Sequence, residues 1–110
     1  MTEKTEILEQ AIRTTRERGE HYGPPSEHFA RTVGMINALI GHKLREPLTP
    51  ADWATFMILD KLSRDQARPK VDNDLDGIGY FACRHEVRNV AAPLTSAAHA
   101  EKIGGEVPKT

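Results

Sequence analysis

The chain has 110 residues, of which 38% are apolar and 28% are charged, a length and balance typical of one globular domain. Its 15 basic and 16 acidic residues give a formal net charge of −1, which excludes a global field that would attract nucleic acid or an anionic membrane. The sequence contains neither a bilayer-spanning apolar run nor the apolar core of a signal peptide, so we expect a cytoplasmic protein.

The N-terminal part of the sequence predicts a helix over residues 5–18, because its apolar residues recur at helical spacing. These apolar residues are Ile7, Leu8, Ala11 and Ile12. Gly19 is the expected end of this helix. Residues 21–25, with the sequence His-Tyr-Gly-Pro-Pro, then form a loop that the two prolines stiffen.

A second helix is predicted over residues 26–45. Ser26 is its expected N-cap, because a serine hydroxyl can accept a hydrogen bond from a free amide of the first turn. Apolar residues separated by three or four positions predict one core-facing stripe along this helix. They are Phe29, Val33, Ile36, Ile40 and Leu44.

The clearest helix start in the sequence is Thr49-Pro50-Ala51-Asp52, with threonine as N-cap, proline at the first helical position and an acid three residues after the cap. It predicts a third helix from Pro50 to Ala67, which Pro69 ends. Apolar residues occupy nearly the whole circumference, so we expect this helix to be central and the most buried. One chain of four helices would not cover it easily, which predicts a homo-oligomer.

A fourth helix is predicted from Asp72 or Asp74 to Val90. Its apolar residues are Leu75, Ile78, Phe81 and Ala82. After Ala91 the chain is rich in small residues, glycine and proline, which predicts a flexible tail over residues 92–110. We therefore expect an all-α fold of about four helices, packed as a compact bundle over residues 1–91.

The single cysteine, Cys83, excludes an internal disulfide and fits a reducing cytosol. We interpret it as a structural thiol, because His85 would lie on a different face of the fourth helix and could not act as its base. The sequence also lacks a zinc-binding Cys/His pattern and a phosphate-binding glycine-rich loop, which argues against those two kinds of site.

Charged residues on the third helix are the main functional signal. Lys61, Arg64 and Arg68 lie within about 60° of one another around the helix axis, next to an apolar surface. A short linker makes the third and fourth helices antiparallel neighbours, so Lys61 and Arg64 can face Asp72 and Asp76. Two interpretations stay open: a salt-bridge network that holds the seam, or a polar pocket.

In the pocket interpretation, Lys61 and Arg64 bind phosphate oxygens, and the arginine can hold two of them. Asp72 and Asp76 orient these cations or hold Mg²⁺, which prefers carboxylate oxygens and water. Mg²⁺ is thus the one cofactor the sequence suggests.

The loop after the first helix is the second candidate for a site. Arg18 precedes it and His28 follows it, while His21 could donate to a phosphate and Tyr22 could stack on a base. The alternative is a rigid connector whose tyrosine packs into the core.

Taken together, these residues give the chain a resemblance to a family of short, uncharacterised proteins of phages and prophages. The shared pattern is Arg18…Tyr22-Gly23…Phe29, then Lys61-Leu62-Ser63-Arg64, then Asp72…Asp76-Gly77-Ile78-Gly79-Tyr80. The resemblance spans residues 15–90 and implies a phage setting, in which the protein would act in the host cytoplasm.

A weaker likeness is to the all-α nucleoside triphosphate pyrophosphatases of MazG type. Asp72…Asp76 followed by a Gly-Tyr helix looks like the second half of their ExxE…ExxD pattern, which implies Mg²⁺ bound by these two acids. Lys61 and Arg64 stand where the first half has a glutamate pair.

Three functions follow from these observations. The first is a non-catalytic binder of a nucleotide or another phosphate-bearing small molecule, which in a phage would sequester a host immune signalling nucleotide. The second is a Mg²⁺-dependent pyrophosphatase of MazG type, and the third is a protein–protein interaction module without a small-molecule site. The phosphate-binding residues of the first are Lys61, Arg64, Arg18, His21 and Tyr22. Whether the chain is an enzyme stays open, with binding favoured.

Overall fold

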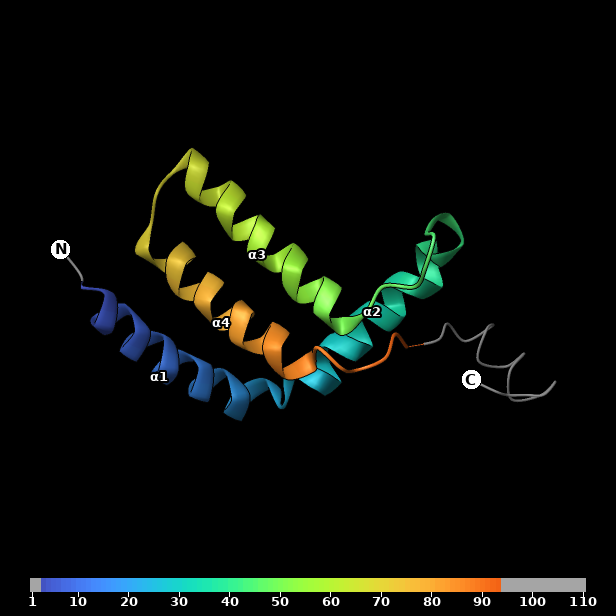
Figure 1. Cartoon of the computed structure of the whole chain (residues 1–110), viewed down its shortest axis with the longest axis horizontal. Helices are drawn as coiled ribbons and strands as arrows, with labels where there is room; N and C mark the ends of the chain where they lie inside the picture. Colours follow the sequence, from blue (N-terminus) through green and yellow to red (C-terminus); the bar gives the residue numbers. More distant parts are fainter. Residues whose placement is uncertain (1–2, 94–110) are drawn as a thin grey trace.

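The structure, a computed structural model, describes residues 3–93 of the chain. This part is all-α, and its four helices pack together as predicted (Figure 1). The elements are α1 (Lys4–Tyr22), α2 (Pro25–Ile40), the 3-10 turn η1 (Gly41–Lys43), α3 (Pro50–Ala67) and α4 (Val71–Val87). Of the predicted tail, residues 94–110 lie outside the described residues. None of the helices in residues 3–93 has the length and apolar character that crossing a membrane requires.

Helix α1 extends beyond its predicted end at Gly19. The helix continues through Gly19 to Tyr22, and the amide of Gly23 donates to the Gly19 carbonyl at 3.0 Å. A single exposed glycine costs a helix only about 1 kcal/mol, so it does not end one by itself. Gly23 has a φ of 76°, a left-handed conformation that glycine adopts without strain, and this residue ends the helix.

Helix α2 differs from its prediction at both ends. It begins at Pro25, and the carbonyl of Pro24 accepts hydrogen bonds from the amides of Glu27 and His28. Ser26 therefore lies within the first turn and is not the N-cap, because proline at the first helical position already starts the helix. At the other end the helix stops at Ile40 and the chain continues as the η1 turn.

Helix α3 has the bounds that its capping signal predicts. The Thr49 hydroxyl accepts from the Asp52 amide at 3.2 Å, and the Asp52 carboxylate accepts from the Thr49 amide at 2.9 Å. This reciprocal capping box satisfies two backbone donors at the helix start.

Helix α4, not α3, has the central place in the bundle. It lies between α1 and α3 in Figure 1 and contacts each of the other three helices. The prediction that α3 is the central helix is therefore wrong. Its apolar circumference instead leaves Phe56, Leu59 and Leu62 exposed by 42, 55 and 58%.

The core is small and lies where α2 meets α3 and α4. Phe29, Ala54 and Val87 are buried against one another, one from each of these helices. Partly buried residues surround them, including Trp53 and Tyr80.

A buried asparagine connects three segments that are distant in the sequence. Asn37, on α2, is 1% exposed. Its amide nitrogen donates to the carbonyls of Leu48 at 3.1 Å and Pro93 at 3.3 Å, and its oxygen accepts from the Leu48 amide at 2.9 Å. One side chain thus holds the approach to α3 and the chain after α4 against α2.

We expect Asn37→Leu to lower the free energy of unfolding by about 3 kcal/mol, because it leaves the backbone groups of Leu48 and Pro93 without their buried partner. Urea unfolding followed by circular dichroism measures this loss. Gln66→Ala, at an exposed position of α3, is the control and should change stability by less than about 0.5 kcal/mol. Equal stability of the two variants would contradict the role given to Asn37.

The turn between α3 and α4 is closed by Asp65. Its carboxylate accepts from the Lys70 amide at 3.0 Å and from the Asn73 side chain at 3.2 Å. These hydrogen bonds, that of the Lys70 amide first, hold the pKa of Asp65 below its usual value.

A lowered pKa in the folded state means that the Asp65 carboxylate stabilises the fold above its unfolded pKa and stops doing so as the pH falls through its folded pKa. We therefore expect Asp65→Asn to be less stable than the wild type at pH 7, and the difference to shrink in acid. Urea midpoints at a series of pH values test this. Asp74→Asn, at an exposed acid of α4, is the matched control, and a difference that grew in acid would contradict the assignment.

Candidate functional site

A cavity of about 610 Å³ opens between α1, α4 and the start of α2. Helix α3 contributes Lys61 to its wall. The functional groups discussed below that line it are Arg18, Tyr22, His28, Lys61, Asp76 and Tyr80. Segments from all four helices thus meet in one concave surface, which is the usual setting for a small-molecule site.

Two cations from different helices share one carboxylate in this cavity. Arg18 of α1 lies 2.9 Å from one oxygen of Asp76, and Lys61 of α3 lies 3.0 Å from the other. The Lys61 and Asp76 side chains are each 18% exposed, whereas Arg18 is 49% exposed. This group of three carries a net charge of +1, and the carboxylate of Glu86, which also lines the cavity, offsets it.

The other part of the cavity wall is a chain of rings. Tyr22 and His28 have ring centroids 6.2 Å apart, His28 and Phe29 are 5.6 Å apart, and Phe29 and Tyr80 are 6.4 Å apart. All four rings line the cavity. These separations are those of tilted aromatic contacts, so the rings form one continuous apolar surface.

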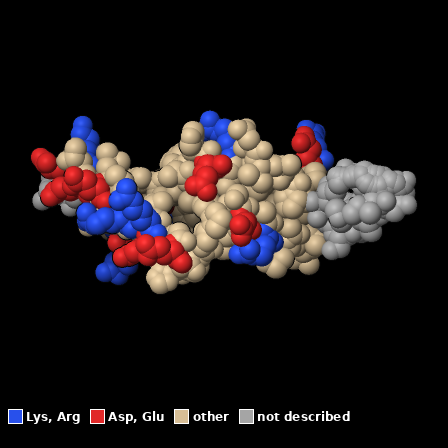
Figure 2. All heavy atoms as spheres, turned by 90° about the horizontal axis from the view of Figure 1, so that it is seen from below, with Lys and Arg blue, Asp and Glu red and all other residues tan. Residues whose placement is uncertain are grey.

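Attraction of an anion must come from this local group and not from the whole protein. The net charge is −1, and Figure 2 shows positive and negative side chains gathered together at the end of the molecule that holds the N-terminus. Charges of opposite sign in one place largely cancel at a distance.

The structure brings together Arg18, Tyr22, Lys61 and Asp76 of the predicted site, since all four line the cavity. His21 does not line it, although its ring lies 6.3 Å from that of Tyr22. The predicted pairing of Lys61 with Asp76 across the seam is present.

Arg64 does not face the acids of α4, and that part of the prediction is wrong. It bonds Asp60, one turn back on its own helix, at 3.0 Å, and its side chain is 65% exposed. Residues four apart are neighbours on a helix surface, so the Asp60 carboxylate is within easy reach of Arg64.

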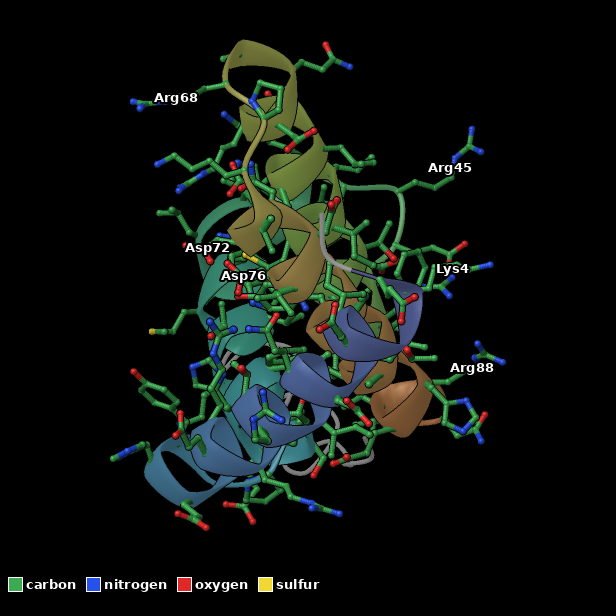
Figure 3. All side chains as sticks on the ribbon, turned by 90° about the vertical axis from the view of Figure 1, so that its left-hand side faces the viewer. Lys4, Arg45, Arg68, Asp72, Asp76 and Arg88 are labelled. Carbon is green, nitrogen blue, oxygen red and sulfur yellow. The ribbon has the colours of Figure 1, made fainter. Side chains whose placement is uncertain are left out.

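The two acids predicted to bind Mg²⁺ are in different surroundings. Asp76 bonds two cations, whereas Asp72, one turn earlier on α4 in Figure 3, is exposed and does not line the cavity. Among residues 3–93, His, Cys, Asp and Glu side chains do not gather in any group of three or more that could hold a metal ion. Of the cavity-lining residues, Asp76 and Glu86 carry the carboxylates.

Sequence reasoning missed the part of the wall formed by α1. Thr14 and Thr15 line the cavity beside Arg18 and Tyr22. Thr14 and Thr15 precede Arg18 by four and three residues, and Tyr22 follows it by four. This helical spacing places the side chains on one face of α1, so the sequence could have predicted that they lie together.

Cys83 also lines the cavity, and its thiol is half-buried. Burial raises the pKa of this thiol, the nearby Glu86 carboxylate raises it further, and Arg18 opposes both. Such a thiol is a weak nucleophile at neutral pH.

A family model described as a domain of unknown function (DUF6378) matches residues 6–88, and the chain belongs to this family. A search of curated proteins and a search of solved structures each find no match. The matched range spans nearly all of α1 to α4, so the helices that form the cavity belong to the family domain. The phage setting and the likeness to MazG-type enzymes stay predictions.

We expect Cys83 in the folded protein to react with iodoacetamide about tenfold more slowly at pH 7.5 than in the urea-unfolded chain, because its raised pKa lowers the thiolate fraction. The rate should rise with pH. Glu86→Gln should increase it modestly, since it removes one of the two causes of the raised pKa. Equal rates in the folded and unfolded chains would contradict this description of the thiol.

Proposed function

We propose that this DUF6378 protein binds a small molecule in which a phosphate is attached to a flat ring, as in a nucleotide. The observation that carries the proposal is that the Arg18–Asp76–Lys61 group and the chain of four rings line the same cavity. A cationic group beside an aromatic surface matches a ligand with an anionic end and a flat end.

The phosphate would bind at the two cations. Asp76 pairs with both cations, as a phosphate would. Phosphate oxygens can replace or join the carboxylate, with the Arg18 guanidinium able to donate to two oxygens and the Lys61 ammonium acting as a point charge. Asp76 thereby neutralises part of the charge of the two cations until a ligand binds.

The ring of the ligand would lie against Tyr22, His28 or Tyr80. Stacking of a base on an aromatic side chain contributes about 1–3 kcal/mol and tolerates different bases. Tyr22 is 65% exposed, so part of its ring is available for such a contact. Thr14 and Thr15 offer hydroxyl groups that could hydrogen-bond the ring or sugar.

Binding without hydrolysis is the form of the proposal that the residues favour. Retention of a nucleotide needs cations and rings, whereas pyrophosphatase chemistry of the MazG kind needs several carboxylates around Mg²⁺. In a phage setting, a protein of this kind would sequester a host immune signalling nucleotide.

A mixed pool of linear and cyclic nucleotides tests the proposal directly. The pool is incubated with the purified chain and Mg²⁺, and the bound and free fractions are identified by mass spectrometry. We expect a nucleotide that is retained intact and released on denaturation. Conversion of a triphosphate to a monophosphate would instead establish the pyrophosphatase, and a pool left unbound and unchanged would favour the interaction module.

The cations on α3 offer a matched pair of variants for the retained nucleotide. We expect Lys61→Gln to weaken its binding about 10- to 100-fold, because the variant loses a charged hydrogen-bond donor in the cavity. Arg64→Gln removes the same charge from the same helix outside the cavity and should change affinity by less than about twofold.

Isothermal titration measures both affinities, and circular dichroism checks that both variants are folded. Equal weakening by the two substitutions would show a general charge effect and would remove Lys61 from the site.

A further inference from the structure

The two cations of the cavity converge on a single anionic group. The Arg18 guanidinium lies 2.9 Å from one oxygen of Asp76, and the Lys61 ammonium lies 3.0 Å from the other. Because both oxygens belong to one carboxylate, the two cationic groups are within hydrogen-bond distance of the same small anion. The cationic part of the cavity therefore has the size of one phosphate group.

The cavity wall holds as many acids as cations. Within residues 3–93, its charged side chains are Arg18, Lys61, Asp76 and Glu86. The next cation of α3, Arg64, pairs with Asp60 and does not line the cavity. The wall thus supplies cations for one phosphate group and no positive excess for a second.

Acids also predominate directly around the wall. Among the described residues, five acids are immediate sequence neighbours of a lining residue, against three arginines. These acids are Glu17, Glu20, Glu27, Asp60 and Asp74. A ligand with several negative charges would gain attraction at one of them, whereas like charges would repel the others.

Glu86 places a negative charge at the far end of the α4 wall. It follows Asp76 by ten residues, which is about 15 Å along a helix. Its carboxylate raises the pKa of the Cys83 thiol and Arg18 opposes that effect, so both charges act within the same cavity. A phosphate chain that extended along α4 from the cations would leave both of them behind and approach a carboxylate.

A phosphodiester presents the same anion as the Asp76 carboxylate. In each group, two oxygens share one negative charge. A terminal phosphate instead has three such oxygens and a charge of about −1.5 to −2 at pH 7, and a triphosphate carries more. Arg18 and Lys61 are already placed for two oxygens of one group, so each can pair with one oxygen of a diester.

We propose that the cavity takes a ligand whose phosphate is a diester with one negative charge, in preference to a nucleotide that ends in a phosphate chain. The inference rests on the function proposed above and names the chemical class of its ligand. The ring of that ligand would lie against the aromatic part of the wall. A diester of this kind occurs in a cyclic mononucleotide and in the linkage between two nucleosides, and both present the same two oxygens.

Four probes that share one base test the proposal by isothermal titration. They are the 3′,5′-cyclic mononucleotide, the dinucleoside monophosphate, the 5′-monophosphate and the 5′-triphosphate. The buffer lacks Mg²⁺, so that the charge on each probe is that of its phosphates alone. The series is repeated with each of the four common bases, because stacking on aromatic side chains tolerates different bases.

We expect the tighter of the two diesters to bind at least about tenfold more tightly than the triphosphate of the same base, with the monophosphate between them. The reason is that the triphosphate brings charges that the wall cannot pair. The two diester probes also distinguish a cyclic mononucleotide from a linkage between nucleosides.

Glu86→Gln and Glu46→Gln form a matched pair of variants for the charge argument. Each removes one negative charge from an exposed glutamate, but only Glu86 lines the cavity. We expect Glu86→Gln to strengthen binding of the triphosphate more than that of the diester and to reduce the ratio of their affinities about threefold. Glu46→Gln should change this ratio by less than about twofold. Circular dichroism checks that both variants are folded.

Three results would overturn the inference. A monophosphate or triphosphate that binds more tightly than both diesters of its base would do so and would leave the proposed function intact. Equal changes of the ratio in the two glutamine variants would show that the discrimination does not arise in the cavity. If the folded protein binds none of the probes at about 1 mM, the proposed function itself fails, and this inference fails with it.

Discussion

Helix α4 contacts each of the other three helices. This arrangement brings residues from all four helices together around one cavity. Because α1 packs on one side of α4 and α3 on the other, a single carboxylate on α4 can reach cations from both. Asp76 occupies that position. The cavity forms where α1 crosses α4 and the first turns of α2 cover the gap, which is why its wall combines Arg18, Lys61 and the rings of α2.

The Arg18–Asp76–Lys61 group lies beside the core, because both contribute residues to the cavity wall. The Arg18–Asp76 pair has a 49% exposed arginine and contributes at most about 1 kcal/mol, so it positions charges more than it holds the helices together. Stability comes from the core around Phe29, whose ring also forms part of the cavity wall, and from the three hydrogen bonds of Asn37.

The sequence predicted the fold where local chemistry decides structure, and failed where tertiary packing decides it. The capping box at Thr49 is a local signal, and the bounds of α3 were correct. The pairing of Lys61 with Asp76 followed from helical periodicity and a short linker. The partner of Arg64 was predicted wrongly. Helical periodicity gives the direction of a side chain, but it does not say which of two carboxylates a long side chain will pair with. The structural role of Asn37 was missed, because its hydrogen-bond partners lie 11 and 56 residues away in the sequence.

The apolar circumference of α3 predicted both a central helix and a homo-oligomer, and the structure contradicts the first of these. Such a pattern fits a central helix, but it equally fits a helix that is covered on one side by its own chain and on the other by a second molecule. The central place belongs to α4, and Leu59 and Leu62 are therefore left exposed in a single chain. These residues and the Lys61–Asp76 pair lie on opposite sides of α3, whose inner edge holds a cation at the cavity. The side chain by which α3 reaches the cavity is therefore distinct from the apolar side chains that it exposes.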